Sequence, residues 1–226
     1  VILAAGAQWS GAWTQRLSGT GQADVWEVLG SHGDVTHVSW RQGWRPLEPL
    51  TSAQFGKETF EQYLVDTLDE RAPRLLIMEC PSKHWYQCTQ AMPHKNNSAK
   101  QKEKKIRESI TPFLKTAKFV ADKQLTEGRD FLLETPMTKE VLRHPQMKEM
   151  IANEKINVTQ GNPSKKHTWW LTSSFEISQE LEKPSKEQSR HPAHIPAKMV
   201  KGVMIGFGRT LHHKEPERIK GLVRAV

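Results

Sequence analysis

Cysteine is scarce in this sequence, and no long run of apolar residues occurs in it. The 226 residues include only Cys80 and Cys88, too few for the disulfide framework of a small secreted domain, so we expect a reducing compartment. No apolar run approaches the about 20 residues that a membrane-spanning helix needs, so we predict no membrane partner. An intracellular, nuclear or organellar location fits these absences, and the sequence does not choose among them.

Acidic residues are also outnumbered. The chain has 25 Asp and Glu against 33 Lys and Arg, which gives a formal net charge of +8 and a pI near 9.5. A field of this sign attracts polyanions, either nucleic acids or anionic membrane surfaces. Because apolar runs are lacking, we expect the partner to be a nucleic acid, either DNA or RNA.

The sequence does contain much aromatic surface. Only 36% of the residues are hydrophobic, but eight Trp and seven Phe supply large surfaces for a core, which a disordered chain would lack. We predict one α/β domain over residues 1–182 and a C-terminal extension, residues 183–226, that packs on it. The chain starts without Met in an apolar run, so we interpret it as a fragment of a longer protein.

Short apolar or β-branched runs alternate with segments of helical periodicity. This alternation predicts an α/β fold with a doubly wound, mostly parallel sheet. In such a sheet the ligand-binding residues gather at the carboxyl ends of the strands. The expected strands are residues 1–4, 35–40, 75–79, 131–134, 156–159 and 169–173.

Two helices are expected between these strands. Apolar residues recur every four positions within 60–68, and this helix should end near 72–73. A longer apolar stripe covers 106–121, with Gly128 in the position of a C-terminal cap. Pro112 lies inside the stripe, so an alternative start of the helix at Pro112 stays open.

The strand ends carry short motifs in a particular order. They read GWRPL at 43–47, MECPSKHW at 78–85, FLLETP at 131–136, WLTSS at 170–174 and HPAH at 191–194. Together these motifs resemble a divergent methyltransferase-like domain that is related to the cytosine-C5 DNA methyltransferases and is often found in retroelement polyproteins of marine protists. The resemblance spans nearly the whole chain and implies a Rossmann-like methyltransferase fold.

The resemblance also implies a catalytic apparatus. In such enzymes a Pro-Cys loop supplies a thiolate, because a soft nucleophile must add to an electron-poor ring carbon and later leave. A Glu-Asn dipeptide after the next strand contacts the ring nitrogen. Here Ser82 stands where the cysteine would be, and Thr135 follows Glu134 in place of asparagine. Ser82 and Glu134 are therefore remnant catalytic positions. Their alternative roles are a turn residue for Ser82 and a helix cap for Glu134.

The positions that would hold S-adenosylmethionine are eroded in the same way. The resemblance places a glycine-rich turn after the first strand, and here Gly6 is followed by the bulky Trp9. At the end of the second expected strand, Ser39 replaces the acidic residue that would bind the ribose. We assign Gly6, Ser39 and Glu79 as remnant cofactor positions. No cofactor is expected, with S-adenosylmethionine as the cofactor if the domain is active.

Four side chains between 80 and 94 invite a zinc interpretation. Thiolates and imidazoles are preferred zinc ligands. The spacing of the four residues matches no familiar zinc motif, so we predict no metal site. The four residues are Cys80, His84, Cys88 and His94.

A lysine-dense segment, 94–107, lies between an expected strand end and the long helix. It fits either a mobile basic loop or a solvated helix start. Its cations are expected to contact phosphates without sequence specificity, and the nearby Trp85 is a candidate for stacking on a base. The expected nucleic-acid-binding residues are Trp85, Lys95, Lys100, Lys102, Lys104, Lys105, Arg107, Lys165 and Lys166.

Three functions follow from these observations. The first is a catalytically impaired methyltransferase-like domain, a pseudoenzyme that binds nucleic acid or helps to assemble a ribonucleoprotein or larger polyprotein. The second is an active S-adenosylmethionine-dependent methyltransferase that acts on a DNA or RNA base. The third is a basic scaffold domain whose surfaces contact only other proteins in a large complex.

Overall fold

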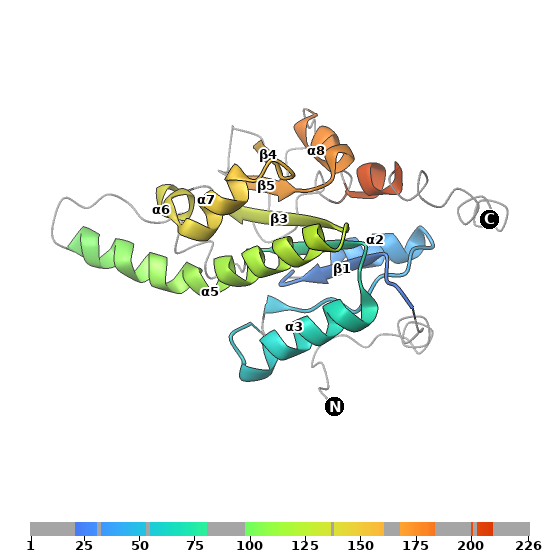
Figure 1. Ribbon diagram of the computed structural model, residues 1–226, viewed down its shortest axis with the longest axis horizontal. Helices are drawn as coiled ribbons and strands as arrows, with labels where there is room; N and C mark the ends of the chain where they lie inside the picture. The colour runs from blue at the N-terminus through green and yellow to red at the C-terminus, as the bar shows by residue number, and fades with distance from the viewer. Residues whose placement is uncertain are drawn as a thin grey trace.

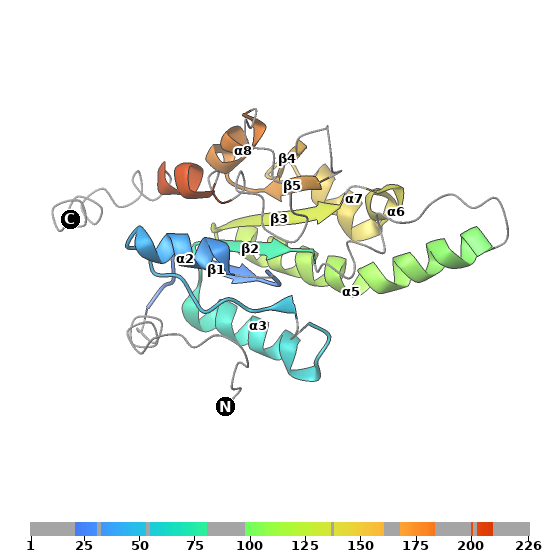
Figure 2. The same ribbon diagram turned by 180° about the vertical axis from the view of Figure 1, so that it is seen from behind.

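The protein has an α/β fold in which helices cover both faces of one sheet (Figure 1). The computed structural model describes residues 21–30, 33–52, 55–80, 98–136, 138–160, 168–183, 200 and 203–209. The expected strand at 1–4 and the turn at Gly6 lie outside these residues. Seen from behind, the same layers are visible, with α3 and α8 on opposite sides of the strands (Figure 2).

Five strands form the sheet in the order β1–β2–β3–β5–β4. The first three are parallel: β1 (Val25–Val28), β2 (Leu75–Glu79) and β3 (Asp130–Pro136). The last two form an antiparallel pair, in which β5 (Thr168–Thr172) lies between β3 and β4 (Asn157–Gln160). The sheet is therefore parallel in part. The structure confirms four predicted strands, and each end lies within two residues of its predicted position. They are the strands predicted at 75–79, 131–134, 156–159 and 169–173.

A further segment pairs with the free side of β1. Val25 bridges Pro46 and Val28 bridges Leu50, both in the parallel sense. Prolines 46 and 49 have no backbone N–H to donate, which accounts for isolated bridges in place of a continuous strand. After β1, the chain first places residues 46–50 along one side of β1 and then places β2 along the other side. The growth of the sheet reverses at β1.

One face of the sheet is covered by four helices: α3 (Glu58–Arg71), α5 (Ser98–Thr126), α6 (Lys139–Arg143) and α7 (Pro145–Ala152). They share one hydrophobic cluster with alternate strand residues. Its members include Trp26, Leu76, Phe131, Phe60, Leu64, Phe113, Leu114 and Met147. Each such side chain contributes about 1.5–3 kcal/mol when fully buried, so this face supplies much of the folding free energy.

The opposite face is covered by α2 (Asp34–Arg41), α8 (Phe175–Glu182) and the helical residues 203–209. Its cluster includes Val25, Ile77, Trp170, Val35, Ile177 and Phe207. A Cβ atom at Gly206 would lie 2.7 Å from the Cα of Ile177, so the last helix packs directly against the backbone of α8. Part of the predicted C-terminal extension thus contributes to this core, whereas the boundary at residue 182 stays a prediction.

One expected element is wrong, and one strand was missed. Residues 35–40, predicted as a strand, lie in α2, and residues 46–50 pair with β1 instead. The run has β-branched residues, but Gly33 in the left-handed conformation (φ 69°) and Asp34 in the first turn favour a helix start. The strand at 25–28 was not predicted, because the charged Glu27 interrupts its apolar run.

The long helix was predicted correctly along the stripe at 106–121 but begins earlier than expected. It starts at Ser98, so the alternative start at Pro112 is wrong, and residues 98–107 are helical where a loop was one of two interpretations. The helix over 60–68 is confirmed and ends at Ala72. Gly128 has φ 67°, as a C-terminal cap requires, and lies just past the end of α5.

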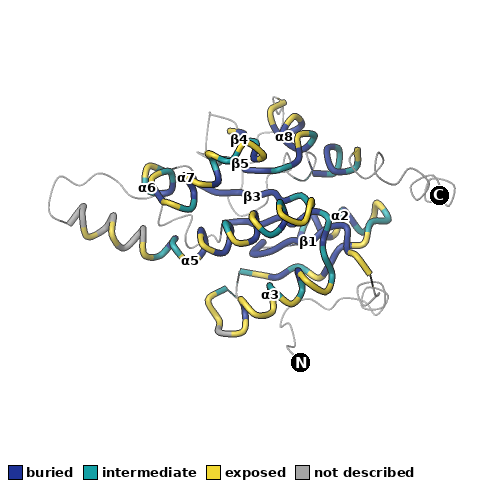
Figure 3. Tube along the Cα trace, in the orientation of Figure 1, coloured by how far each residue is buried: buried dark blue, intermediate teal, exposed yellow. Residues whose placement is uncertain are grey.

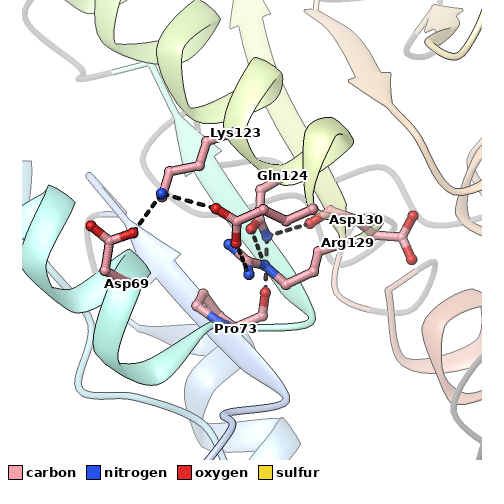
Figure 4. Close-up of polar contacts among 7 residues, drawn as sticks. Asp69, Pro73, Lys123, Gln124, Arg129 and Asp130 are labelled. Carbon is pink, nitrogen blue, oxygen red and sulfur yellow. Dashed lines mark hydrogen bonds and ion pairs between the residues drawn. The ribbon is translucent and has the colours of Figure 1, made fainter.

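The amino edge of the parallel strands is held by a network of polar contacts (Figure 4). Gln124, fully buried at the end of α5, donates from Nε2 to the carbonyls of Pro73 (3.0 Å) and Asp130 (2.8 Å). Its Oε1 accepts from Nε of Arg129 at 2.6 Å. Lys123 pairs with Asp69 at 2.5 Å, which ties α5 to α3. One glutamine thus joins the residues that precede β2 and begin β3.

Candidate functional site

Three glutamates lie at the carboxyl edge of the parallel strands, one on each strand. Glu27 is on β1, Glu79 ends β2, and Glu134 is the register partner of Glu79 on β3. Alternation along the strands places all three on the face that α2 and α8 cover. The side chains are buried, with exposed fractions of 0%, 7% and 9%. We call these three residues the carboxyl-edge cluster.

Glu27 is held by the first turn of α2. Its Oε2 accepts hydrogen bonds from the backbone N–H of Thr36 (3.1 Å) and from the Thr36 hydroxyl (3.2 Å). A carboxylate at a helix N-terminus satisfies an N–H group that has no partner within the helix and interacts favourably with the helix dipole. Glu27 therefore fixes the start of α2 against the end of β1.

The other oxygens of Glu27 and Glu79 meet at Gly30. A Cβ atom at Gly30 would lie 2.4 Å from Oε1 of Glu27 and 2.9 Å from Oε1 of Glu79, so a side chain there would displace one or both carboxyl groups. Neither Oε1 accepts a hydrogen bond from a donor among the described residues. Two buried carboxylates cannot both be ionised in such a position at low cost, so the pair is stabilised by one shared proton.

Glu79 binds that proton more tightly than Glu27 does. Burial raises the pKa of Glu79 well above 4.5, and the charges of Glu134 and Glu27 raise it further. Burial also raises the pKa of Glu27, but the two hydrogen bonds from Thr36 oppose this rise because they favour its charged form. The pKa of Glu79 is therefore raised more strongly than that of Glu27, so a proton at this edge resides preferentially on Glu79.

The turn between β1 and α2 is conformationally unusual. Leu29 has φ 65° although it is not a glycine, it is buried, and its N–H donates to the carbonyl of Leu50. A left-handed leucine costs of order 1 kcal/mol or more, and such residues concentrate at functional sites. Gly33 follows with φ 69° and packs against Pro49. Open α/β sheets bind their ligands at strand carboxyl ends where sheet growth reverses, and this turn lies at that place.

The residues of this turn were missed in the sequence. Glu27, Gly30 and Asp34 were not selected, because the glycine-rich turn was sought at Gly6. The signal was present: a short apolar run, 25–29, is followed by Gly30, Gly33 and an acidic residue at a helix start. The charged Glu27 inside the run hid the strand.

The predicted catalytic and cofactor residues are only partly brought together. Glu79 and Glu134 are adjacent, and the backbone N–H of Cys80 donates to the carbonyl of Glu134 at 3.0 Å. Ser39 is not at a strand end: it is fully buried within α2, because the strand expected there is a helix. Ser82 and Gly6 lie outside the described residues, as do Trp9 and Trp85.

No metal centre is found where the structure describes the chain. Among these residues, no group of three or more His, Cys, Asp or Glu side chains is arranged to hold an ion. Cys80 is buried. His84, Cys88 and His94 lie outside the described residues, so the expectation about zinc stays a prediction.

The predicted phosphate-binding residues fall mainly on the first turns of α5. Lys100, Lys102, Lys104, Lys105 and Arg107 all lie in this helix. Lys104 is exposed and forms a loose ion pair with Glu108 at 3.8 Å. Lys95, Lys165 and Lys166 are outside the described residues. We call residues 98–108 the basic arm.

The basic arm projects beyond the other described helices and strands (Figure 1). The 29 residues of α5 extend about 44 Å, whereas the seven residues of β3 extend about 23 Å. The excess lies at the start of the helix, because Ile110 is the first core residue among the described side chains of α5. Since α5 follows the carboxyl end of β2, the arm projects on the side of the carboxyl-edge cluster.

Charges are sorted between the interior and the surface of the described residues. Five carboxylates are buried, whereas the described Lys side chains are not buried and the side chain of Arg129 is 9% exposed; Figure 3 shows the buried strands between the exposed surfaces of the helices. Two of the buried carboxylates, Asp24 and Glu180, lie within ion-pair distance of Arg or Lys side chains. The buried carboxylates are Asp24, Glu27, Glu79, Glu134 and Glu180.

Comparisons with protein-family models, with curated proteins and with solved structures found no significant match. A function is therefore inferred from the geometry of this chain alone. Within the described residues, no helix combines the length and the apolar character that crossing a membrane requires.

Proposed function

We propose that this domain is a methyltransferase-like module that binds nucleic acid through the basic arm and has lost methyl transfer. The observation that carries the proposal is the arm itself. It holds five Lys and Arg against two Glu on a helix that extends beyond the sheet. A cationic helix whose described side chains, Gln101, Lys104 and Glu108, are exposed suits the phosphate backbone of DNA or RNA.

The net charge of the whole chain, +8, gives independent support. A positive net charge attracts a polyanion to the protein, and the arm then offers contacts to its phosphates. Such binding is governed by phosphates and carries little sequence preference.

The loss of methyl transfer is proposed from two features. Ser82 occupies the position of the nucleophilic cysteine, and a serine without a base partner is a weak nucleophile. The carboxyl-edge cluster is at most 9% exposed, so these acids offer a ligand almost no surface. On this proposal, the resemblance reflects a Rossmann-like scaffold that no longer catalyses methyl transfer.

The test is a salt titration of binding to generic DNA and RNA. The logarithm of the affinity should fall linearly with the logarithm of salt concentration, by about 0.9 per phosphate contacted in duplex DNA. Replacement of all five basic residues of the arm by Gln should lower this slope by about three to five units and weaken binding at low salt at least tenfold.

A charge-matched control separates the arm from net charge. Five exposed lysines elsewhere, replaced by Gln, remove the same charge and should change the slope by less than one unit. They are Lys57, Lys115, Lys139, Lys148 and Lys155. Equal decreases in the salt slope of the two variants would argue against binding through the arm. Absence of any salt-dependent binding would remove the proposal and favour a scaffold that contacts only proteins.

A second candidate function is favoured by the turn at Gly30. A glycine-bracketed turn between a parallel strand and a helix, placed where sheet growth reverses, is the arrangement in which doubly wound folds hold a nucleotide-like cofactor. The domain would then be an S-adenosylmethionine-dependent methyltransferase acting on a base. Calorimetry distinguishes the two functions: micromolar binding of S-adenosylmethionine supports the enzyme, and no heat at millimolar cofactor supports the impaired module.

A further inference from the structure

Helix α5 consists of two parts with different surroundings. From Ile110 onward the helix is packed in the core, with Phe113, Leu114 and Ala117 buried. Before Ile110, the described side chains of the arm, which include Lys104 and Glu108, are exposed. The change from exposed arm to packed helix occurs within about one turn.

Pro112 lies at this change. A proline inside a helix has no N–H to donate to the carbonyl four residues earlier, here that of Glu108, and its ring crowds the same carbonyl. Such a position bends a helix or loosens it. The hydrogen-bond ladder of α5 is therefore interrupted at the carbonyl of Glu108, the last residue of the arm, just before Ile110 enters the core.

Two side-chain hydrogen bonds flank this point. On the arm side of the proline, Oγ1 of Thr111 is 3.0 Å from Nε2 of His144. On the body side, the hydroxyl of Thr116 donates to the carbonyl of Pro112 at 3.0 Å. Only the first of these bonds ties α5 to another element.

His144 is well placed to hold the arm. Its side chain is buried, it ends α6 and begins α7, and its N–H donates to the carbonyl of Val141. Val141 and Met147, on either side of it, belong to the same hydrophobic cluster as the packed part of α5. A hydrogen bond to His144 therefore anchors Thr111 to a rigid part of the molecule.

We propose that the hydrogen bond between Thr111 and His144 sets the direction of the basic arm, with Pro112 as the joint about which the arm turns when the bond is absent. Thr111 and His144 are positioning residues: they act on a nucleic acid through the arm and do not contact it. The consequence for binding rests on the proposed function, whereas the joint itself can be measured in the free protein.

The experiment measures the arm directly. Spin labels on non-natural amino acids at Gln101, in the arm, and at Glu154, which is exposed near the amino edge, report one distance by pulsed electron resonance. The distance distribution should be narrow in the unaltered protein. Thr111→Val, which removes the hydroxyl and keeps the shape, should widen or shift it. Thr111→Ser, which keeps the hydroxyl, should leave it narrow.

Pro112→Ala provides the complementary test. A continuous helix no longer needs the anchor, so Pro112→Ala and the double variant with Thr111→Val should both give a narrow distribution. Thr126→Val, an exposed change of the same type at the other end of α5, is the matched control. Circular dichroism verifies that each variant is folded. An unchanged distance distribution in Thr111→Val, or a widened one in the double variant, would overturn the proposal that Pro112 is a joint.

Affinity for nucleic acid gives the second measurement. Loss of one hydrogen bond that orients the arm should weaken binding about fivefold in Thr111→Val and leave Thr111→Ser unchanged. A widened distance distribution with unaltered affinity would leave the joint in place and overturn its role in binding. Absence of nucleic-acid binding by the unaltered protein, by contrast, removes the proposed function and not the joint.

Discussion

Two buried carboxylates three residues apart in one short segment have opposite surroundings. Asp24, at the amino edge, accepts a hydrogen bond from the backbone N–H of Arg45 at 2.8 Å and lies within ion-pair distance of Arg45 (3.6 Å) and Arg74 (3.9 Å). Glu27, three residues later at the carboxyl edge, faces another acid, Glu79. Burial is complete at Asp24 and Glu27.

The difference shows how stability is distributed along the sheet. At the amino edge, ionised groups and amides have partners, and Gln124 joins neighbouring segments. At the carboxyl edge, two buried acids face each other with raised pKa values, and Leu29 has a strained backbone. Polar groups that have hydrogen-bond or ion-pair partners stabilise the amino edge. Polar groups without such partners destabilise the carboxyl edge, and destabilising features of this kind concentrate at functional sites. Amide substitutions at the two edges should therefore have opposite signs.

The largest effect is expected at the amino edge. Asp24→Asn removes the charge that two arginines and one backbone N–H face, and should lower the free energy of unfolding by about 2–3 kcal/mol at pH 7. Urea denaturation measures this loss. Asp66→Asn, a change of the same type on the exposed surface of α3, should cost less than about 0.5 kcal/mol. Equal costs at both positions would mean that the network of Asp24 does not stabilise the edge.

The next effect is expected at the turn. Gly30→Ala places a Cβ atom 2.4 Å from Oε1 of Glu27, so the turn or the acid must shift, at a cost of about 1–2 kcal/mol. Gly208→Ala is the control, because its nearest heavy atom, Cζ2 of Trp44, is at an ordinary 3.6 Å. Thermal unfolding compares the two variants. A Gly30→Ala protein as stable as the control would indicate that the two acids are not packed against the turn.

The smallest effect is expected at Glu79, with the opposite sign. The raised pKa means that the folded protein binds this proton more tightly than the unfolded chain. The resulting stability is full below about pH 4.5 and is lost as the pH rises through the folded-state pKa. Glu79→Gln removes this loss, so at pH 8 the variant should be about 1 kcal/mol more stable than the unaltered protein.

Urea denaturation from pH 4.5 to pH 8 checks the sign. The advantage of Glu79→Gln should grow with pH, and Glu154→Gln, an exposed control, should show no such trend. A variant that loses stability as the pH rises, in parallel with the unaltered protein, would exclude a shared proton at this edge.

The comparison of edges also explains what the sequence could predict. The strands at 75–79 and 131–134 are apolar on both faces, and the helix of 60–68 has a regular stripe, so local pattern is sufficient for them. The strand at 25–28 contains Glu27, whose burial depends on Thr36 and Glu79. Those partners come together only in the folded chain, so no local pattern indicates that this glutamate belongs to a strand.

The candidate site, like the fold, was predicted only where a local sequence pattern indicates the strand that carries it. Glu79 and Glu134 were selected because they end apolar strands, and they are neighbours. Ser39 was selected for a strand end that does not exist, since α2 replaces it. Once the strand at 25–28 is missed, the glycines that follow it cannot be placed, and the turn at Gly30 is missed with it.

Photo-crosslinking tests the central claim, binding through the basic arm, most directly. A photoreactive amino acid placed at Gln101 or at Glu154 is irradiated with a bound DNA or RNA oligonucleotide at low salt. The account predicts strong crosslinks from position 101 that vanish at high salt, and few from position 154. Crosslinks of equal yield from both positions, or from position 154 alone, would contradict it.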